Sequence, residues 1–154
     1  MPSSLEQTPT VLTRIADAIV DALNDGEFCQ EFTAERKTDL VKSMDEVKGL
    51  CVFIYGLRTA RKQDTRSTQR RDHQIGIAVL RRPGKSETLD DLADGMQLLA
   101  EQIADHIDDN PIELCGVNLR SDDIVIDSPY SGEVLRNQRI CICPITVPFI
   151  EFVK

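Results

Sequence analysis

The chain has 154 residues and a mass of 17.3 kDa, the size of one ordinary domain with a core of its own. Hydrophobic residues make up 41% and charged residues 29% of it, which excludes a disordered chain, and no run approaches the roughly 20 apolar residues of a membrane helix. The net charge is −8, which argues against a general nucleic-acid coat, because such proteins are basic overall.

The N-terminus and the cysteines favour an intracellular protein. Residues 1–7 are polar and are expected to be loose, and the first ten residues lack the basic and apolar regions of a secretory leader. Five cysteines at scattered positions fit reduced thiols in a cytosolic protein. Because neither a CxxC motif nor a nearby histidine accompanies Cys141 and Cys143, we expect no metal site and no cofactor.

The first element predicted is an amphipathic helix. Apolar residues recur at three and four positions from Leu12 to Leu23. Thr8-Pro9 is suited to open the helix, with Pro9 at its first position, and Gly26 is suited to end it.

Two strands and a helical turn are predicted next. Phe28–Arg36 and Leu50–Leu57 are rich in aromatic and β-branched residues and predict strands. Ser43 and Glu46 have the spacing of a capping box, which predicts one helical turn that ends at Gly49.

The segment Arg58–Arg71 differs from its surroundings in composition. From Thr59 onward its only apolar residue is Ala60, so it offers almost nothing to a core. Its basic residues, set against the single acid Asp64, are Arg58, Arg61, Lys62, Arg66, Arg70 and Arg71. We predict a long exposed hairpin arm or loop, after which the alternation in Ile75–Val79 predicts a returning strand.

The longest predicted helix is Thr88–Ile107, about 30 Å at 1.5 Å per residue. Apolar residues recur along it at helical spacing and predict a core stripe, namely Leu89, Leu92, Ala93, Met96, Leu99, Ala100, Ile103 and Ile107. Asn110-Pro111 is suited to end the helix. Its outward charges are all acidic and include Asp90, Asp91, Asp94, Glu101 and Asp105.

The last third of the chain is predicted to be mostly β. Leu114–Leu119 and Asp123–Asp127 predict short strands, and Ser131–Asn137 predicts a helical turn. Arg139–Phe149 predicts a long strand whose two prolines place it at a sheet edge or make it irregular. The predicted fold is thus a single α+β domain over residues 1–154. It has a mixed or antiparallel sheet, an N-terminal helix and one long central helix packed on it, and a basic arm at residues 58–71.

Neither catalysis nor nucleotide binding has support in the sequence. Gly84-Lys85-Ser86 lies between a strand and a helix, as a phosphate-binding loop would, but the glycine required five residues earlier is Val79. The motifs GxSxG, HExxH and GxGxxG do not occur. We therefore expect a protein that is not an enzyme and has no catalytic residues.

The charge layout is the most informative feature. Arg58–Lys85 contains nine basic and two acidic residues, a net charge of +7, which leaves −15 for the rest of a chain whose total is −8. The basic arm of one subunit could lie against the acidic helix of the next in a self-assembling ring. A solvated loop and a nucleic-acid contact are the other two interpretations of the arm.

Several short runs resemble small neck and tail proteins of tailed bacteriophages. They are Ile15–Asn24, Phe28–Arg36, Asp45–Leu50, Arg66–Arg70, Ile75–Val79 with the helix after it, and Asp127–Tyr130 with Leu135 and a closing strand. The similarity extends over residues 11–150 and is greatest to the tail terminator, or tail-completion protein, of long-tailed phages. The sequence departs from that pattern at Pro144, Pro148 and the apolar Cys141/Cys143 strand.

The resemblance implies an α+β subunit of a hexameric ring in the virion neck, assembled in the host cytoplasm. Such a ring caps the tail tube and joins it to the head connector, so its partners are further copies of itself, the tube protein and the head-completion protein. Genome DNA would pass through without specific binding, and neither a membrane nor a cofactor is implied. The alternatives are a head-completion or stopper protein and, from a different class, a small nucleic-acid-binding regulator.

Two sets of residues are predicted to form the interface between subunits or with the tube. The basic set is the six arm residues named above. The acidic set is Asp90, Asp94, Glu101 and Asp105.

Overall fold

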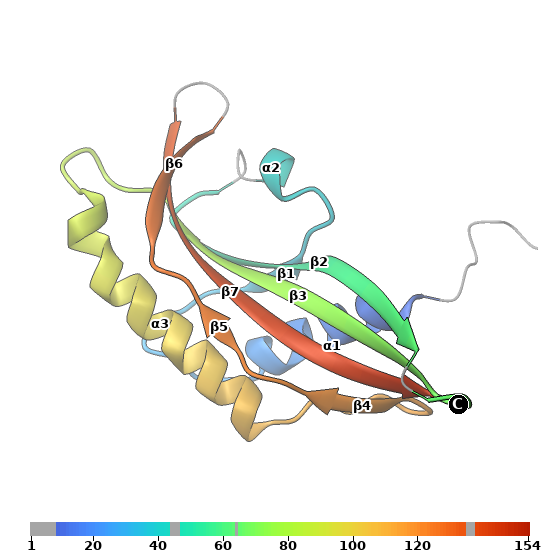
Figure 1. Cartoon of the computed structure of the whole chain (residues 1–154). Coiled ribbons are helices and arrows are strands. Elements are labelled where there is room, and N and C mark those ends of the chain that lie inside the picture. Colours follow the sequence, from blue (N-terminus) through green and yellow to red (C-terminus); the bar gives the residue numbers. More distant parts are fainter. Residues whose placement is uncertain (1–8, 44–46, 64, 135–137) are drawn as a thin grey trace, which may run out of the picture.

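A computed structural model describes residues 9–43, 47–63, 65–134 and 138–154. It contains two long helices, a one-turn helix and a curled, mixed seven-stranded sheet, so the predicted α+β class is confirmed (Figure 1). The predicted loose segment at residues 1–7 lies outside the described residues.

The first helix, α1 (Val11–Asn24), follows the predicted apolar stripe but begins later than predicted. The hydroxyl of Thr10 accepts a hydrogen bond from the amide of Thr13, so Thr10 is the N-cap and Pro9 precedes the helix. Ile15, Ile19 and the other buried residues of α1 face the sheet.

The predicted strand Phe28–Arg36 is wrong for most of its length, since only β1 (Ala34–Arg36) is a strand. Residues 25–33 form a loop in which the Phe28 and Phe32 ring centroids lie 5.1 Å apart. The backbone N–H of Cys29 donates to Gln102 of the long helix at 2.8 Å. The ring centroid of Phe28 also lies 5.3 Å from that of His106 of the same helix, so the aromatic residue that indicated a strand packs this loop against a helix.

The predicted turn between Ser43 and Gly49 is placed differently as well. The one-turn helix α2 is Leu40–Ser43, so Ser43 ends a helix rather than capping one. The amide of Ser43 donates to the carbonyl of Asp39 at 3.1 Å, and its hydroxyl donates to the same oxygen at 2.7 Å. Glu46 lies outside the described residues.

The predicted arm is a regular antiparallel hairpin. β2 (Leu50–Gln63) and β3 (Gln69–Arg81) pair along their whole length, with a bulge between Gly56 and Arg58. The hairpin prediction is therefore confirmed, and the strands extend further into the arm than the sequence indicated.

The long helix α3 (Leu89–Asp109) matches its prediction closely. Thr88 and Asp91 form a reciprocal capping box at its start, and Asn110 caps its end. Its buried stripe, from Leu92 to Ile107, packs on the same side of the sheet as α1.

The last four strands differ from the sequence prediction in three places. The predicted strand Leu114–Leu119 is wrong for most of its length, because the N–H of Val117 donates to the carbonyl of Leu114 at 3.2 Å in a turn, and the strand begins only at Asn118. β4 (Asn118–Ser121), β5 (Val125–Ile126) and β6 (Tyr130–Val134) pair in succession with one edge of β7 (Gln138–Val153). The helical turn predicted at Ser131–Asn137 is wrong, because its described part belongs to β6, and residues 135–137 are not described.

β7 is central rather than an edge strand, because β3 pairs with its other side. The carbonyls of Pro144 and Pro148 accept from Asp127 and Asp122, in the gaps between the three short strands. A residue's N–H and C=O point to the same side of an antiparallel strand. Proline has no backbone N–H. The missing N–H groups of Pro144 and Pro148 thus face the gaps between the short strands, where the pairing with β7 is already interrupted.

The sheet order is β1-β2-β3-β7-β4, with β5 and β6 also on β7. The main core lies between the sheet and the pair α1 and α3. On the opposite face, a smaller cluster covers one end of the sheet, where Val47 and Leu40 pack on Phe53, Leu80 and Ile140.

Candidate subunit interface

The hairpin register divides the basic residues of the arm between its two faces. Arg61 lies opposite Arg71, and Lys62 lies opposite Arg70. Because successive strand residues point to opposite faces, the first pair lies on the helix side of the sheet, and the second pair lies on the other side with Arg58. The structure therefore does not bring the six residues together as one patch.

Asp72 neutralises part of the face that carries Lys62 and Arg70. Its carboxylate lies 2.7 Å from Nε of Arg70 and 3.3 Å from Nζ of Lys62. The hydrogen bond from Arg70 lowers the pKa of Asp72 below its ordinary value, and Lys62 adds to this effect. Arg70 and Arg71 are half-buried rather than fully exposed, so the exposed cations of the arm are Arg58, Arg61, Lys62 and Arg66.

A hydrogen-bonded chain of three side chains ties the arm to the sheet at its base. The Thr59 hydroxyl lies 2.9 Å from Nδ1 of His73, and Nε2 of His73 lies 2.9 Å from Oε1 of Glu151. His73 and Glu151 are buried, and Nη1 of Arg71 lies 3.9 Å from the same carboxylate oxygen. The three strands β2, β3 and β7 are thereby held together where the arm leaves the core.

The acidic set lies along the solvent side of α3. Asp90, Asp94, Glu101 and Asp105 are all exposed. Among the described residues, none of the four is part of an ion pair. Leu98 lies on this acidic side and is 48% exposed.

The predicted acidic and basic sets do not meet within one molecule. The arm tip extends at the end of the sheet where the C-terminus lies, whereas α3 runs along the helix side of the sheet (Figure 1). Two oppositely charged surfaces are thus both open to a partner.

Sequence reasoning missed three exposed residues near these sets. They are Leu98 on α3, Arg120 on β4 and Val125 on β5. The exposure of Leu98 could have been predicted from the sequence, because Leu98 is an apolar residue outside the predicted core stripe. The exposure of Arg120 and Val125 could not, because only the pairing with β7 places them on the face opposite the helices.

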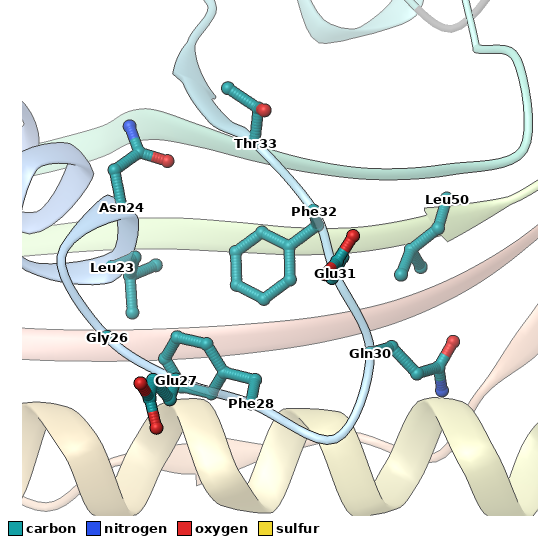
Figure 2. A pocket seen from close by; sticks show the side chains of 10 residues that line it. All are labelled: Leu23, Asn24, Gly26, Glu27, Phe28, Gln30, Glu31, Phe32, Thr33 and Leu50. Carbon is teal, nitrogen blue, oxygen red and sulfur yellow. The ribbon is translucent and has the colours of Figure 1, made fainter.

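A groove of about 800 Å³ lies between the loop at residues 25–33 and the start of β2. Figure 2 shows Phe28 and Phe32 side by side on the loop, with Leu50 on the other side of the groove. Gln30 connects the loop to β3, because its side-chain oxygen accepts a hydrogen bond from Arg81 at 3.2 Å. The charged residues that line the groove are Glu27 and Glu31, so its lining disfavours a phosphate ligand.

The described residues contain no group of three or more His, Cys, Asp or Glu side chains placed to hold a metal ion. Burial raises the pKa of Cys143 to about 11, and it also raises that of Cys141. Neither thiol is suited to act as a nucleophile near neutral pH, because the reactive form is the thiolate. No helix in the described part of the chain is long and apolar enough to cross a membrane.

The chain matches no protein-family model and no curated protein sequence. The resemblance to tail terminators therefore stays a prediction from short sequence runs.

Proposed function

We propose that this protein is a structural subunit of a homo-oligomeric ring that terminates the tail of a long-tailed bacteriophage. The observation that supports this proposal most strongly is the placement of a basic arm and an acidic helix on separate surfaces of one chain. A ring repeats one head-to-tail interface, so every subunit needs two different surfaces that complement each other. The arm and α3 supply such a pair.

The proposed role is geometric and involves no catalytic step. The ring, a hexamer by the resemblance, caps the finished tail tube and presents its other side to the head-completion protein. Its acidic surfaces repel DNA, which favours passage of the genome without binding. The site of action is the virion neck, and neither a cofactor nor a membrane takes part.

The direct test is to add the purified protein to growing tail tubes of the same virus, assembled without heads. We expect tube growth to stop and electron micrographs to show a ring of this chain at the free end. A variant with Arg58, Lys62 and Arg66 changed to Glu should keep its circular dichroism spectrum but lose ring formation, because its arm would repel the acidic helix.

Tubes that reach the same length with and without the protein would contradict the proposal. A chain that binds only to isolated heads would instead identify a stopper protein, the nearest alternative in the same assembly class.

Nucleic-acid binding is the second candidate function, because Arg61 and Arg66 are exposed and take part in no ion pair among the described residues. Binding of duplex DNA at moderate salt, with an affinity that falls steeply as salt rises, would favour this function over a terminator.

A further inference from the structure

We propose that the sheet face opposite α1 and α3 is the docking surface for α3 of a second copy of this chain. The inference rests on the proposed function, because it identifies the two surfaces that meet between neighbouring subunits. It is carried by an apolar strip with basic residues on both sides, together with an exposed leucine set among acids on α3.

The apolar strip is formed by alternate residues of β7. Cys143, Ile145, Val147 and Phe149 lie in the main core, so the residues between them point away from the helices. The strip consists of Pro144, Thr146, Pro148, Ile150 and Phe152, all half-buried. Neither hydrophobic cluster of the described residues includes any of them. Val125, paired with Thr146, widens the strip and is 52% exposed.

Basic residues border both sides of the strip at its arm end. Phe152 is paired with Arg70 of β3 on one side, and Ile150 is paired with Arg120 of β4 on the other. Pro148 lies opposite Gln74, whose side-chain oxygen accepts from Nε of Arg58 at 3.1 Å. The cations that face the same side of the sheet as the strip are Arg58, Lys62, Arg70 and Arg120. Asp72 faces that side as well and forms ion pairs with Lys62 and Arg70.

The outer side of α3 has the complementary character. Leu98 is 48% exposed and lies outside the core stripe. Asp94 and Glu101 are four residues before it and three after it, so they lie on the same helix face. An apolar side chain flanked by acids would therefore meet an apolar strip flanked by bases.

The two surfaces lie on opposite sides of the same sheet, so one chain cannot bring them together. Contact between copies is head-to-tail and would give each sheet a helical layer on both faces, an arrangement that buries its second apolar face. A second copy fits this face better than duplex DNA does, because phosphate contacts would leave the apolar strip uncovered.

Cysteine cross-linking tests this arrangement directly. The exposed thiols are first removed as Cys29→Ser and Cys115→Ser, and Leu98→Cys and Val125→Cys are then made in separate chains. We expect a mixture of the two chains to form Leu98→Cys/Val125→Cys dimers under mild oxidation, identified by mass spectrometry. The matched control replaces Val125→Cys with Glu113→Cys, at an exposed position outside both surfaces.

Charge exchange tests the polarity of the interface. One variant carries Asp94→Lys and Glu101→Lys, and the other carries Arg58→Glu and Arg120→Glu. Each variant alone should associate at least about tenfold more weakly than the native chain, because both of its surfaces then have the same sign. An equimolar mixture should regain association as alternating subunits, measured by sedimentation. Arg61→Glu with Arg66→Glu makes the same charge change away from the strip and should have the smaller effect.

The inference is overturned if the cysteine mixture cross-links no more than its control, in solution and on tail tubes. It is also overturned if the Arg58→Glu, Arg120→Glu variant associates normally and loses only binding to duplex DNA. Rings that keep this interface but leave tail tubes uncapped would reject the proposed function alone. Native rings that cap tubes but form without this interface would reject the inference alone.

Discussion

At the scale of single residues, Gly76 and Tyr55 illustrate how a strand glycine serves the packing of a neighbour. Tyr55 lies opposite Gly76 in the β2–β3 ladder, and a Cβ added to the glycine would lie 2.3 Å from Cζ of the tyrosine ring. The ring occupies the space that a side chain would need. Burial and the nearby Tyr130 both raise the pKa of Tyr55, so its hydroxyl stays neutral at physiological pH.

We expect Gly76→Ala to lower the free energy of unfolding by about 1–3 kcal/mol, because the tyrosine ring must move. Urea denaturation of this variant, of Tyr55→Ala and of the double variant measures the coupling between the two residues. The double variant should lose less than the sum of the single losses. Strictly additive losses would show that the two residues do not share this space.

Glu151 is the second residue with a testable local role, because it accepts from the buried His73. Glu151→Leu removes this acceptor, so the buried Nε2 of His73 loses its hydrogen bond to Glu151. We expect this loss to lower the free energy of unfolding by about 2 kcal/mol. Glu151→Gln keeps an acceptor oxygen at the same place and should cost less. Equal losses of unfolding free energy in the two variants, measured by urea denaturation, would show that the hydrogen bond does not contribute to stability.

At the scale of elements, β7 connects most of the fold. It pairs with β3 along one side and with β4, β5 and β6 along the other, and its odd-numbered residues from Cys141 to Phe149 form part of the main core. Cys141 and Cys143 are buried there, whereas Cys29 and Cys115 are exposed. The reactivity of the cysteines therefore reports on the integrity of this strand.

We expect iodoacetamide at pH 8 to label Cys29 and Cys115 of the folded protein and to leave Cys143 unlabelled. The pKa of Cys143, about 11, keeps its thiol protonated at pH 8, and burial blocks the reagent. The thiolate fraction of a group with a raised pKa grows only as the pH approaches that value, so labelling of the native chain should stay low until the pH nears 11. Mass spectrometry in denaturant supplies the control, and rapid native labelling at Cys143 would contradict the packing of β7.

At the scale of the whole molecule, the residues that stabilise the fold and the residues that carry the basic charge lie in different places. The first form the core, and the second form the arm. The main cluster joins α1, α3 and the central strands, and among the described residues it contains none of the arm at residues 58–71. The arm is held by its own ladder and, at its base, by Thr59, His73 and Glu151.

We expect replacement of residues 61–71 by a two-residue Asn-Gly turn, which keeps Ala60 opposite Asp72, to change the melting temperature of the domain by only a few degrees. The removed segment buries little apolar surface, and Asn-Gly suits a two-residue hairpin. The same variant should lose ring formation in sedimentation and on tail tubes. Rings of normal size from the shortened chain would show that the arm has no part in assembly.

The sequence by itself determined the helices, the arm and the segregation of charge. The apolar stripes of α1 and α3 repeat at helical spacing, so the local pattern was enough to predict both helices. The arm was predictable because a segment with one apolar residue cannot enter a core.

Only the tertiary structure decided which residues share a face and which strand lies at the centre. The prolines of β7 suggested an edge, but the breaks between β4, β5 and β6 accommodate them, and nothing in the local sequence records those breaks. Phe28 and Phe32 suggested a strand, but they pack against each other in a loop, where Phe28 also contacts His106 of α3. The division of the arm's cations between two faces likewise depends on the β2–β3 register. The physical reason is that strand pairing joins residues far apart in the chain, whereas helical periodicity is set by neighbours within a few residues.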